Sequence, residues 1–526
     1  MKNYLKLILI LVITSTSQTL IAQDKITIIA NQQIDTNTKF MQGFLHGGPG
    51  YLDSVKVAKL KPEFWRIGAY FLAGSGYQET KRFNPKIIVN INDLYMIVNN
   101  IPSQSQSQPW VGNWAAWDNL VAMIANNSVT NNEPVDEWDL WGEPDNFWTG
   151  NYSQWIEMYR RTDSIITSII PNAKIIGPEF GFATCNFNVV PILQFLDSLY
   201  SVGTTLSGVS WHEFCNPQDV PSHVQQVRDS LALRPWLGNL DILIPEYAGP
   251  ANHTIPGWNV GWLYYFEKSK VDWVSHGCWD ETDGTNGWSN CEYGLNGLFM
   301  WDNSTPQPNY WVHRAYAELD SIRLVSNSTN LKTIALAGIN NTNQEMKMLV
   351  GRYDNPNLGQ HNTTSNVEVK ILNYPYCSNC TVPLVVQKIP SNNVSYSIPL
   401  TSPITTISST LTFLGDSAVV NLNGFVDGDA CIIYINPSSG SVLTTVDYLP
   451  IKQQFKIYPN PTSNLITVGI PNTEKTIIQI YNSLGIIVKE IETNHSTQID
   501  ISTLTNGIYF VRNLKFPTQI LKFIKQ

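Results

Sequence analysis

One arrangement repeats through residues 138–279, a short apolar run that closes on a polar or aromatic residue. The runs are WDLWGE at 138–143, KIIGPE at 174–179, SGVSWHE at 207–213, DILIPE at 241–246 and WVSHGCW at 273–279. Their first residues are 36, 33, 34 and 32 positions apart, which is typical of repeated strand–helix units. Residues 152–169, between the first two runs, carry apolar side chains at helical spacing. The stretch therefore predicts strands that alternate with helices.

Three similar runs come earlier in the chain: MQGFLHG from 41, FWRIGA from 64 and KIIVNIN from 86. Eight strands with helical connections favour a (β/α)8 TIM barrel over residues 23–320. An open doubly wound sheet is the alternative, but it needs a phosphate-binding glycine loop after its first strand. The sequence there, GGPGYLDS at 47–54, fits neither GxGxxG nor GxxxxGK[ST]. We therefore predict the α/β barrel.

The pattern changes beyond Arg314. Short strand-like runs between Asn, Gly and Pro turns predict an antiparallel β-sandwich over residues 321–440, which the strand at 25–30 could join. The runs lie at 331–337, 346–353, 367–372, 394–400, 410–414 and 431–435. Further short strands, such as FKIYPNPTSNLITVGI at 455–470, predict a small all-β domain over residues 450–526.

The composition excludes some classes of protein. Of the 526 residues, 43% are hydrophobic and 11% aromatic, so the chain has ample apolar surface to bury and is not a disordered one. The net charge is −9 and there is no Lys/Arg-rich run, which argues against a nucleic-acid partner. All 17 tryptophans lie from Trp65 to Trp311. The barrel is therefore where we look for chemistry.

Residues 1–22 have the pattern of a secretory signal peptide. Lys2 and Lys6 precede the apolar run LILILVI at 7–13, and small or polar residues lead to Ala22. A membrane anchor is the alternative, but this run is too short to span a bilayer. No later stretch approaches 18 apolar residues, so we expect an exported mature protein without a membrane span.

Export makes disulfides possible. The chain has seven cysteines, so one of them stays free or pairs outside the chain. Cys377 and Cys380 form a single CxxC, which is two ligands short of a structural zinc site. We therefore expect a local disulfide between them.

Polar residues close most of the predicted barrel strands, at the end where barrel active sites lie. Such residues are costly unless they face a wet cleft. In strand order they are His46, Arg66, Asn92-Asp93, Glu143, Glu179, His212-Glu213, Glu246 and Trp279-Asp280. There is no GxSxG, and Asn216 stands where HExxH needs its second histidine, so neither a serine hydrolase elbow nor a zincin site is present.

Two carboxylates in a cleft lined by aromatic rings suit the cleavage of a glycosidic bond. One carboxyl protonates the departing oxygen, while the other attacks the anomeric carbon or activates water. Tryptophan faces stack on sugar rings because these combine an apolar face with polar edges. The residues thus predict a glycoside hydrolase with a carbohydrate substrate and with no metal or organic cofactor.

The stretch WDLWGEPDNFW at 138–148 resembles the acid/base motif of clan A glycoside hydrolases. Together with NAKIIGPEF, ILIPEYAGP, GCWD and TPQPNYWVHRAYA, it is similar to glycoside hydrolase family 39. The resemblance implies Glu143 as acid/base, Glu246 as nucleophile, Arg66 as a contact of the nucleophile, His212 as a subsite residue and Trp279 as a sugar platform. From their places after strand one and after the motif, His46 and Trp148 join the expected substrate-binding residues.

This assignment implies a retaining mechanism through a glycosyl-enzyme intermediate. As an acid, Glu143 needs a raised pKa, and we expect burial beside Glu246 and Trp141 to raise it. One residue departs from the family: Gly142 replaces the usual Asn, which holds the substrate's 2-hydroxyl. A non-catalytic carbohydrate-binding protein on a degenerate barrel is therefore the competing hypothesis.

The C-terminal segment resembles the type A sorting domain of the type IX secretion machinery. The resemblance rests on Tyr458-Pro459-Asn460-Pro461, Tyr481-Asn482, Gly485, Asn506-Gly507-Ile508-Tyr509 and the terminal Lys522 and Lys525. It implies that the type IX machinery is a partner, and that the protein is secreted or held at the surface of a Gram-negative bacterium. A generic adhesive β-module is the alternative.

Overall fold

The structure is a computed structural model, and it describes most of the chain. The described residues are 23–34, 40–46, 52–69, 72, 75–91, 114–182, 185–277, 279, 294–300, 302–320, 322–355, 363–391, 399–436, 456–469, 475–482, 486–494, 496–513 and 516–526. The expected signal peptide at 1–22 lies outside them.

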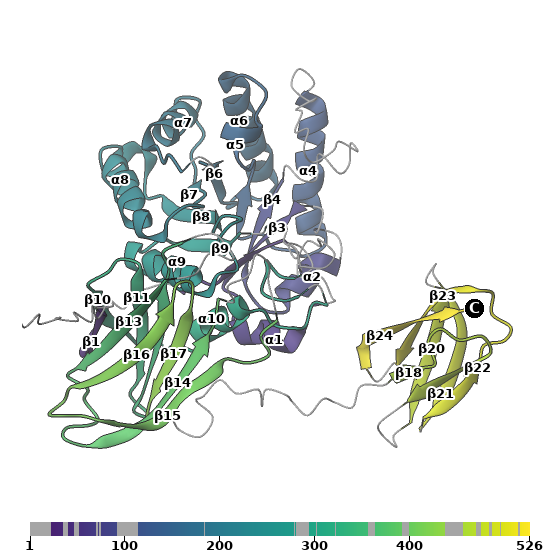
Figure 1. Cartoon of the computed structure of the whole chain (residues 1–526). Helices are drawn as coiled ribbons and strands as arrows, with labels where there is room; N and C mark the ends of the chain where they lie inside the picture. The colour runs from purple at the N-terminus through teal and green to yellow at the C-terminus, as the bar shows by residue number, and fades with distance from the viewer. Residues whose placement is uncertain are drawn as a thin grey trace, which may run out of the picture.

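Eight parallel strands form a closed barrel in chain order, which confirms the predicted fold class. The strands are β2 (Gly43–Leu45), β3 (Phe64–Gly68), β4 (Lys86–Asn90), β5 (Glu137–Asp139), β6 (Ile175–Phe180), β7 (Gly208–Trp211), β8 (Asp241–Tyr247) and β9 (Trp273–His276). Figure 1 shows helices packed around them. The helices are α1 (Ser54–Leu60), α2 (Ser75–Lys81), α4 (Trp114–Thr130), α5 (Pro144–Phe147), α6 (Tyr152–Ile169), α7 (Val189–Ser201), α8 (Val220–Ala232), α9 (Pro256–Ser269) and α10 (Pro308–Ala317).

Alternation along the strands places a polar layer at one end of the barrel. Phe64, Ile88, Ile176, Leu243 and Trp273 form a buried cluster of their own, separate from the larger core between strands and helices. Because strand side chains alternate between faces, the residue two positions after a cluster member shares its face. Two positions after Phe64 stands an arginine, and two positions after Ile88 an asparagine. The barrel interior therefore changes from apolar to polar towards the carboxyl ends of its strands.

A second set of strands forms one nine-stranded sheet, in the order β15-β14-β17-β12-β11-β10-β1-β13-β16. Its strands are β1 (Gln23–Gln33), β10 (Ile322–Ser328), β11 (Thr333–Asn340), β12 (Glu345–Arg352), β13 (Thr364–Leu372), β14 (Thr381–Ile389), β15 (Ile404–Thr412), β16 (Ala418–Val426) and β17 (Ala430–Ile435). It is antiparallel except where β1 and β13 pair in parallel. Its buried face forms a separate apolar core.

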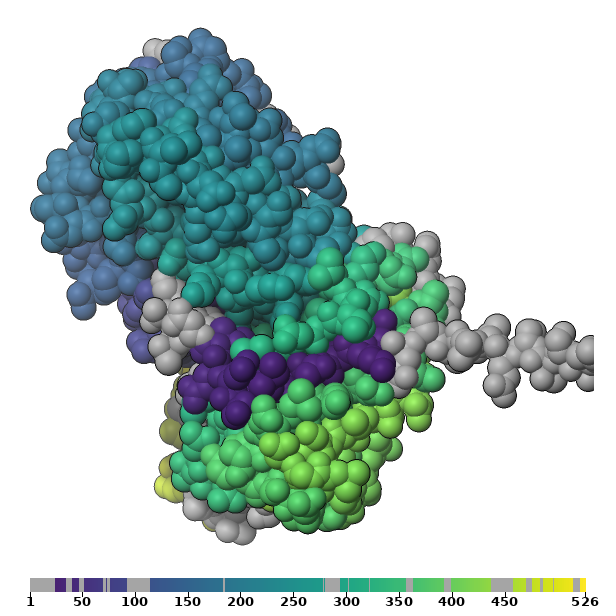
Figure 2. Space-filling view, turned by 90° about the vertical axis from the view of Figure 1, so that its left-hand side faces the viewer, coloured from purple at the N-terminus to yellow at the C-terminus, as the bar shows by residue number. Residues whose placement is uncertain are grey.

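The strand β1 belongs to this sheet although it precedes the barrel in sequence. It pairs with β10 on one side and β13 on the other, and Figure 2 shows it in purple against the green strands. The sequence does not predict β10, β14 or β16. Both β14 and β16 carry residues that are rare in strands, Pro383 in the first and Gly424 in the second. Most of the run predicted at 394–400 lies outside the described residues.

Helix α9 joins the barrel to the sheet through close backbone packing. A Cβ on Gly257 would lie 2.1 Å from the carbonyl oxygen of Arg352, and one on Gly351 would lie 2.5 Å from Cβ of Val260. The same junction buries an ion pair. Arg323 Nε lies 3.1 Å from Glu267 Oε1, and Tyr316 Oη donates to that oxygen at 2.6 Å. The barrel and the sheet therefore share a packed, charge-compensated interface.

The C-terminal strands form a small all-β unit with its own apolar core. A three-stranded sheet has the order β18-β19-β22, and a four-stranded sheet has the order β21-β20-β23-β24. The strands are β18 (Lys456–Tyr458), β19 (Leu465–Gly469), β20 (Thr476–Asn482), β21 (Ile487–Thr493), β22 (Thr497–Asp500), β23 (Gly507–Asn513) and β24 (Phe516–Lys525). This agrees with the small all-β unit expected there.

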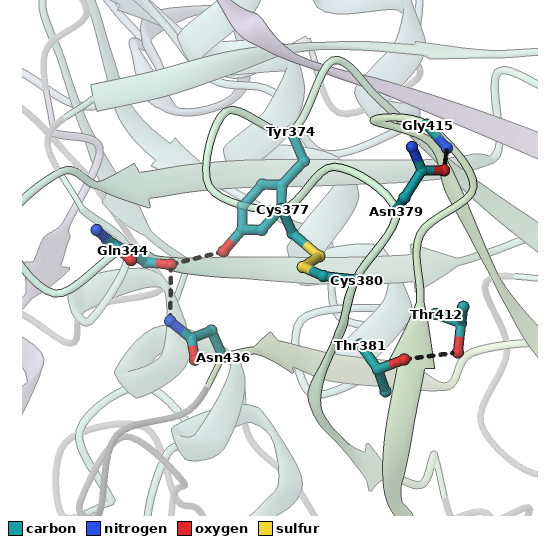
Figure 3. The surroundings of a disulfide bond; sticks show 9 residues. All are labelled: Gln344, Tyr374, Cys377, Asn379, Cys380, Thr381, Thr412, Gly415 and Asn436. Atoms are coloured by element: carbon teal, nitrogen blue, oxygen red, sulfur yellow. Dashed lines mark hydrogen bonds between the residues drawn. A yellow bond between two sulfur atoms is a disulfide. The ribbon is translucent and has the colours of Figure 1, made fainter.

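A disulfide joins Cys377 to Cys380 between β13 and β14. Figure 3 shows it beside Tyr374, whose hydroxyl donates to the carbonyl oxygen of Gln344 at 2.6 Å. Cys431, in β17, is buried and free, and its burial raises the pKa of its thiol. Within the described ranges, no helix is both long and apolar enough to cross a membrane.

Removal of Arg323 should destabilise the protein, because it leaves the Glu267 carboxylate buried without its partner. We expect Arg323→Met to lower the free energy of unfolding by about 3–5 kcal/mol. Arg160→Met is the matched control, since Arg160 forms an exposed ion pair with Glu157 and should change stability by less than about 1 kcal/mol. Thermal and denaturant unfolding measure both, and equal effects would contradict a stabilising junction.

Candidate active site

Two glutamates face one histidine at the carboxyl ends of the barrel strands. Glu143 follows β5 directly before α5, and Glu246 lies in β8. His212 Nδ1 is 3.0 Å from Glu143 Oε1 and 3.8 Å from Glu246 Oε2. These two oxygens are therefore no more than about 7 Å apart. Each glutamate side chain is 17% exposed, whereas that of His212 is 2% exposed. The structure thus brings together the predicted acid/base, nucleophile and subsite histidine.

Local backbone features hold Glu143 in place. Its φ of 49° is left-handed, and its backbone N–H donates to the carbonyl oxygen of Glu179 at 3.0 Å. Asn146 Nδ2 donates to Glu143 Oε2 at 3.2 Å. Gly181 leaves room for this carboxylate, because a Cβ there would lie 2.7 Å from Glu143 Oε1. The backbone and the neighbouring glycine therefore decide where the carboxylate lies.

Arg66 lies beneath this group and binds two buried carboxylates. Its Nε donates to Asp139 Oδ2 at 2.8 Å, and its Nη2 donates to Glu179 Oε2 at 2.9 Å. Asn90 Nδ2 also donates to Asp139 Oδ2, at 2.8 Å. The resemblance placed this arginine against the nucleophile, whereas its ion pairs here are with Asp139 and Glu179. It is a charge-compensating residue below the two glutamates.

Gly142 lies against the carboxylate of Glu179. The Glu179 side chain is fully buried, and its Oε1 lies 3.4 Å from His212 Nε2. A Cβ on Gly142 would lie 3.1 Å from Glu179 Oε2 and 3.5 Å from Arg66 Nη2. The space that a side chain at 142 would enter is therefore next to the carboxylate of Glu179.

His212 carries the proton of the site. Burial acts to lower its pKa, but the hydrogen bond to Glu143, the close contact with Glu179 and the charges of Glu179 and Glu246 raise it to about 10. Burial acts to raise the pKa of Glu143, yet His212 and Asn146 outweigh it and leave this pKa lowered. The expected rise for Glu143 was therefore wrong, because the sequence indicates burial but not the cation beside the carboxyl.

The pKa values of the other three carboxylates are raised or lowered according to the charged groups beside them. Burial raises the pKa of Glu246 to about 6, with His212 opposing the rise and Glu143 adding to it. Burial and the charge of Glu179 raise the pKa of Asp139 to about 7, against the effect of Arg66. Burial acts to raise the pKa of Glu179 as well, but Arg66 and His212 leave it lowered. At neutral pH, Glu246 is therefore largely ionised.

Aromatic rings border the site on the β7–β9 side. Trp279 donates through Nε1 to the carbonyl oxygen of Ala248 at 2.8 Å. Its ring meets that of Phe214 edge-on at 5.3 Å, and Phe214 meets His212 edge-on at 5.2 Å. Trp279 is half-buried. It thus lies close to the end of β8, the strand of Glu246, and the resemblance implies that Trp279 is a sugar platform.

Trp148 lies in a different pocket, of about 290 Å³. That pocket is lined by Pro144, Asp145, Trp148, Tyr152, Trp155, Phe180, Pro191 and Gln194, and neither predicted catalytic glutamate is among them. Trp148 meets Trp141 edge-on at 5.4 Å. It therefore lines a pocket beside α5 to which neither predicted catalytic glutamate contributes.

The remaining sequence-predicted residues have varied places. The carbonyl oxygen of His46 accepts a hydrogen bond from Trp65 Nε1, and burial and Arg66 lower the pKa of His46 to about 4. Glu213 is a wall residue, since its Oε1 accepts from Trp211 Nε1 at 2.6 Å and lies 2.9 Å from His223 Nδ1. The predicted positions Asn92-Asp93 and Asp280 lie outside the described residues.

Sequence reasoning missed Asp139 and Asn90 and gave Glu179 no part beyond the wall of the site. Asp139 and Asn90 are polar residues at the ends of buried strands, like the predicted ones, and that signal could have found them. Within the described part of the chain, no three His, Cys, Asp or Glu side chains are arranged to hold a metal ion.

A disulfide between Cys185 and Cys215 links the segment after β6 to the segment after β7. Glu179 ends the first of these strands and His212 follows the second. The covalent bond thus fixes together the two segments that bring Glu179 and His212 into contact.

Residues 456–525 match the family described as "Secretion system C-terminal sorting domain". The C-terminal β-unit is a secretion sorting domain. The match covers β18 to β24 and confirms the predicted sorting domain. No curated protein matches the chain.

Solved structures similar to this chain cover its barrel and sandwich. N2152 from Neocallimastix frontalis has a TM-score of 0.64 and 20% identity, over 79% of this chain and 100% of its own. A monomeric β-xylosidase from Caulobacter crescentus CB15 has a TM-score of 0.54 and 14% identity, over 80% of this chain and 100% of its own. The GH39 enzyme from Xanthomonas axonopodis pv. citri has a TM-score of 0.55 and 13% identity, over 81% of this chain and 99% of its own. At these identities the likeness is one of fold, and this fold is the predicted one.

The disulfide between Cys185 and Cys215 should stabilise the protein more than the one between Cys377 and Cys380. The first closes a segment of 30 residues and the second a segment of three, and the longer loop loses more chain entropy when closed. We expect replacement of the first pair by alanine to lower the free energy of unfolding by about 3 kcal/mol. The second pair is the control, and a larger loss there in denaturant unfolding would contradict this account.

Proposed function

We propose that the protein is a secreted glycoside hydrolase that cleaves O-glycosidic bonds with retention of configuration. One observation carries the proposal: Glu143 and Glu246 meet at a shared histidine, at the carboxyl end of a closed barrel. Both carboxylates are partly exposed, so a substrate can reach them. The likeness of fold to solved glycosidases supports the same reaction class.

The charges assign the two roles. Glu246 is ionised above about pH 6 and attacks the anomeric carbon to form a glycosyl-enzyme ester. Glu143 and His212 share one proton across a 3.0 Å contact. Glu143 delivers that proton to the departing oxygen, and its carboxylate then takes a proton from the water that cleaves the ester. The proton count of the pair is restored at the end of each cycle.

The spacing of the carboxylates agrees with a retaining mechanism. Retaining enzymes hold their carboxyl groups about 5–5.5 Å apart, whereas inverting enzymes need about 6.5–9.5 Å to admit a water molecule. The bound of about 7 Å between Glu143 Oε1 and Glu246 Oε2 admits the spacing of a retaining pair. We therefore propose a glycosyl-enzyme intermediate on Glu246.

A non-catalytic binding protein is the competing function, and Gly142 was its support. In the structure, the buried carboxylate of Glu179 packs against this glycine, and a Cβ at 142 would lie 3.1 Å from Glu179 Oε2. Glycine instead of asparagine at 142 changes the contacts beside Glu179 but leaves Glu143 and Glu246 in place. We therefore favour the enzyme.

The charge of the site favours an uncharged substrate. Arg66 and His212 are the cations beside the glutamates, and both are already paired with carboxylates. The segments that follow the eight barrel strands contain 11 Asp or Glu and no Lys or Arg. These segments are 46–53, 69–74, 91–113, 140–151, 181–188, 212–219, 248–255 and 277–307. A carboxylated or sulfated sugar would meet like charge there.

The sorting domain supports export. We propose that the type IX machinery carries the protein to the cell surface or the medium, where its glycan substrate is found, after the expected signal peptide at 1–22 has directed it out of the cytoplasm.

Variants of the two glutamates should differ in their dependence on the leaving group. We expect Glu246→Gln to abolish release of reducing ends from a panel of plant and algal glycans. Glu143→Gln should slow cleavage of natural glycosides by about 10²–10⁴-fold, yet affect aryl glycosides with acidic phenols little, because these need little protonation. The surface variant Glu157→Gln is the control. Near-normal turnover by Glu246→Gln, or an inverted first product by NMR, would refute the retaining assignment.

Negative charge on the glycan should slow the reaction. For each neutral glycan that the enzyme cleaves, we expect carboxymethylated and sulfated derivatives to show at least about ten-fold lower kcat/KM at low ionic strength. Added salt should narrow the difference, because it screens exposed charges. A reducing-end assay over a salt series measures both effects. Faster cleavage of the anionic derivative would show that the charge of this face does not select the substrate.

A further inference from the structure

The carboxylate of Glu179 is in an unusual setting for a wall residue. It comes from β6, it is fully buried, and its backbone φ of 60° is left-handed. A non-glycine residue in that conformation persists only where its surroundings fix it, which points to a role. It packs closely on Gly142, since a Cβ there would stand 3.1 Å from Glu179 Oε2. The left-handed backbone at Glu179 and the close contact with Gly142 thus together position this carboxylate.

From that place Glu179 takes part in a continuous series of charged contacts. Arg66 Nη2 donates to it at 2.9 Å from below, and its Oε1 lies 3.4 Å from His212 Nε2. The other ring nitrogen of His212, Nδ1, lies 3.0 Å from Glu143 Oε1. The two nitrogens of one imidazole therefore face two carboxylates, of which one is buried and the other is open to substrate.

We propose that Glu179 is a positioning residue, which acts through His212 to keep the proton that Glu143 delivers to the departing oxygen. This inference rests on the proposed function. It concerns the path of the proton rather than the identity of the catalytic pair. Glu179 itself touches neither the sugar nor the reacting atoms in this scheme.

The proton balance follows from the contacts. At rest, the imidazolium of His212 bears a proton on Nδ1, directed at Glu143 Oε1. When the glycosidic bond breaks, that proton passes to the Glu143 carboxylate and from there to the departing oxygen, which leaves as a hydroxyl. His212 is then neutral. In the second half of the cycle, Glu143 takes a proton from the attacking water, and His212 regains its proton by the reverse path.

Other charged groups around His212 bear on this account. Glu246, in β8, lies 3.8 Å from Nδ1, and Asp139, in β5, binds the far side of Arg66. Burial acts against a charge on the imidazole, and the surrounding carboxylates outweigh it. Loss of the Glu179 charge would remove one of the two carboxylates that bind Arg66 and the one that faces His212 Nε2. Loss of the Glu179 charge should therefore lower the pKa of His212, because an opposite charge 3.4 Å from Nε2 is removed.

The test is the titration of His212 and the pH dependence of the reaction in Glu179→Gln, which keeps the shape of the side chain but removes its charge. We expect the pKa of His212, followed by NMR of the imidazole, to fall by at least about one unit, as loss of a neighbouring opposite charge implies. The alkaline limb of the kcat/KM profile should move down by the same amount. The acidic limb, which belongs to Glu246, should move less.

Glu213→Gln is the matched control. Glu213 is a buried carboxylate that faces His223 instead of His212, so this variant should change the titration of His223 and leave that of His212 as it is. Gly142→Ala is a second test, because its Cβ would press on Glu179 without removing its charge. We expect a smaller shift of His212 in the same direction. Circular dichroism and thermal unfolding establish whether each variant is folded. If Glu179→Gln does not fold, the His212 titration in Gly142→Ala decides.

Two results separate this inference from the proposed function. An unchanged His212 titration in folded Glu179→Gln or Gly142→Ala, with normal glycan cleavage, would overturn the role of Glu179 and leave the glycosidase intact. A lowered His212 pKa in a protein that cleaves no glycan of the panel would contradict the proposed function, while the contact between Glu179 and His212 would stand.

Discussion

The burial of negative charge at the carboxyl end of the barrel is the constraint on which the whole site depends. Asp139 and Glu179 are fully buried, and ionised carboxylates in such a place are very costly unless cations and hydrogen bonds compensate them. Arg66 and His212 supply the cations. The left-handed backbone at Glu143 and Glu179 and the absent side chain at 142 bring the carboxylates around these two cations.

The same charges decide where the proton of the site lies. In a glycosidase, the nucleophile is ionised and the acid holds a proton, and burial of the acid is one common way to achieve this. Here a buried histidine between Glu143 and Glu179 holds the proton and lowers the pKa of Glu143, whereas burial raises the pKa of Glu246 against the effect of that histidine. In the proposed mechanism, Glu143 and His212 act as one protonated unit, in which the imidazole holds the proton that the carboxyl delivers.

The rest of the molecule stabilises this arrangement from outside. The disulfide between Cys185 and Cys215 ties together the segments after β6 and β7. Helix α9, which follows the strand of Glu246, packs on the sandwich through Gly257 and Gly351. Because packed interiors yield little, a barrel helix held in this way keeps its strand in register. The sandwich therefore stabilises the barrel on the nucleophile's side.

The sequence by itself determined the barrel, the two glutamates and the sorting domain. Barrel strands are buried on both faces, so they appear as apolar runs at regular spacing, and Glu143 and Glu246 close two of them. The YPNP and NGIY motifs identify the C-terminal unit because they are local. Only the tertiary structure decided the parts of Asp139 and Glu179, the protonation of His212 and the place of β1. Each of these depends on which charge or strand edge faces another across the fold, and local sequence does not record such pairings.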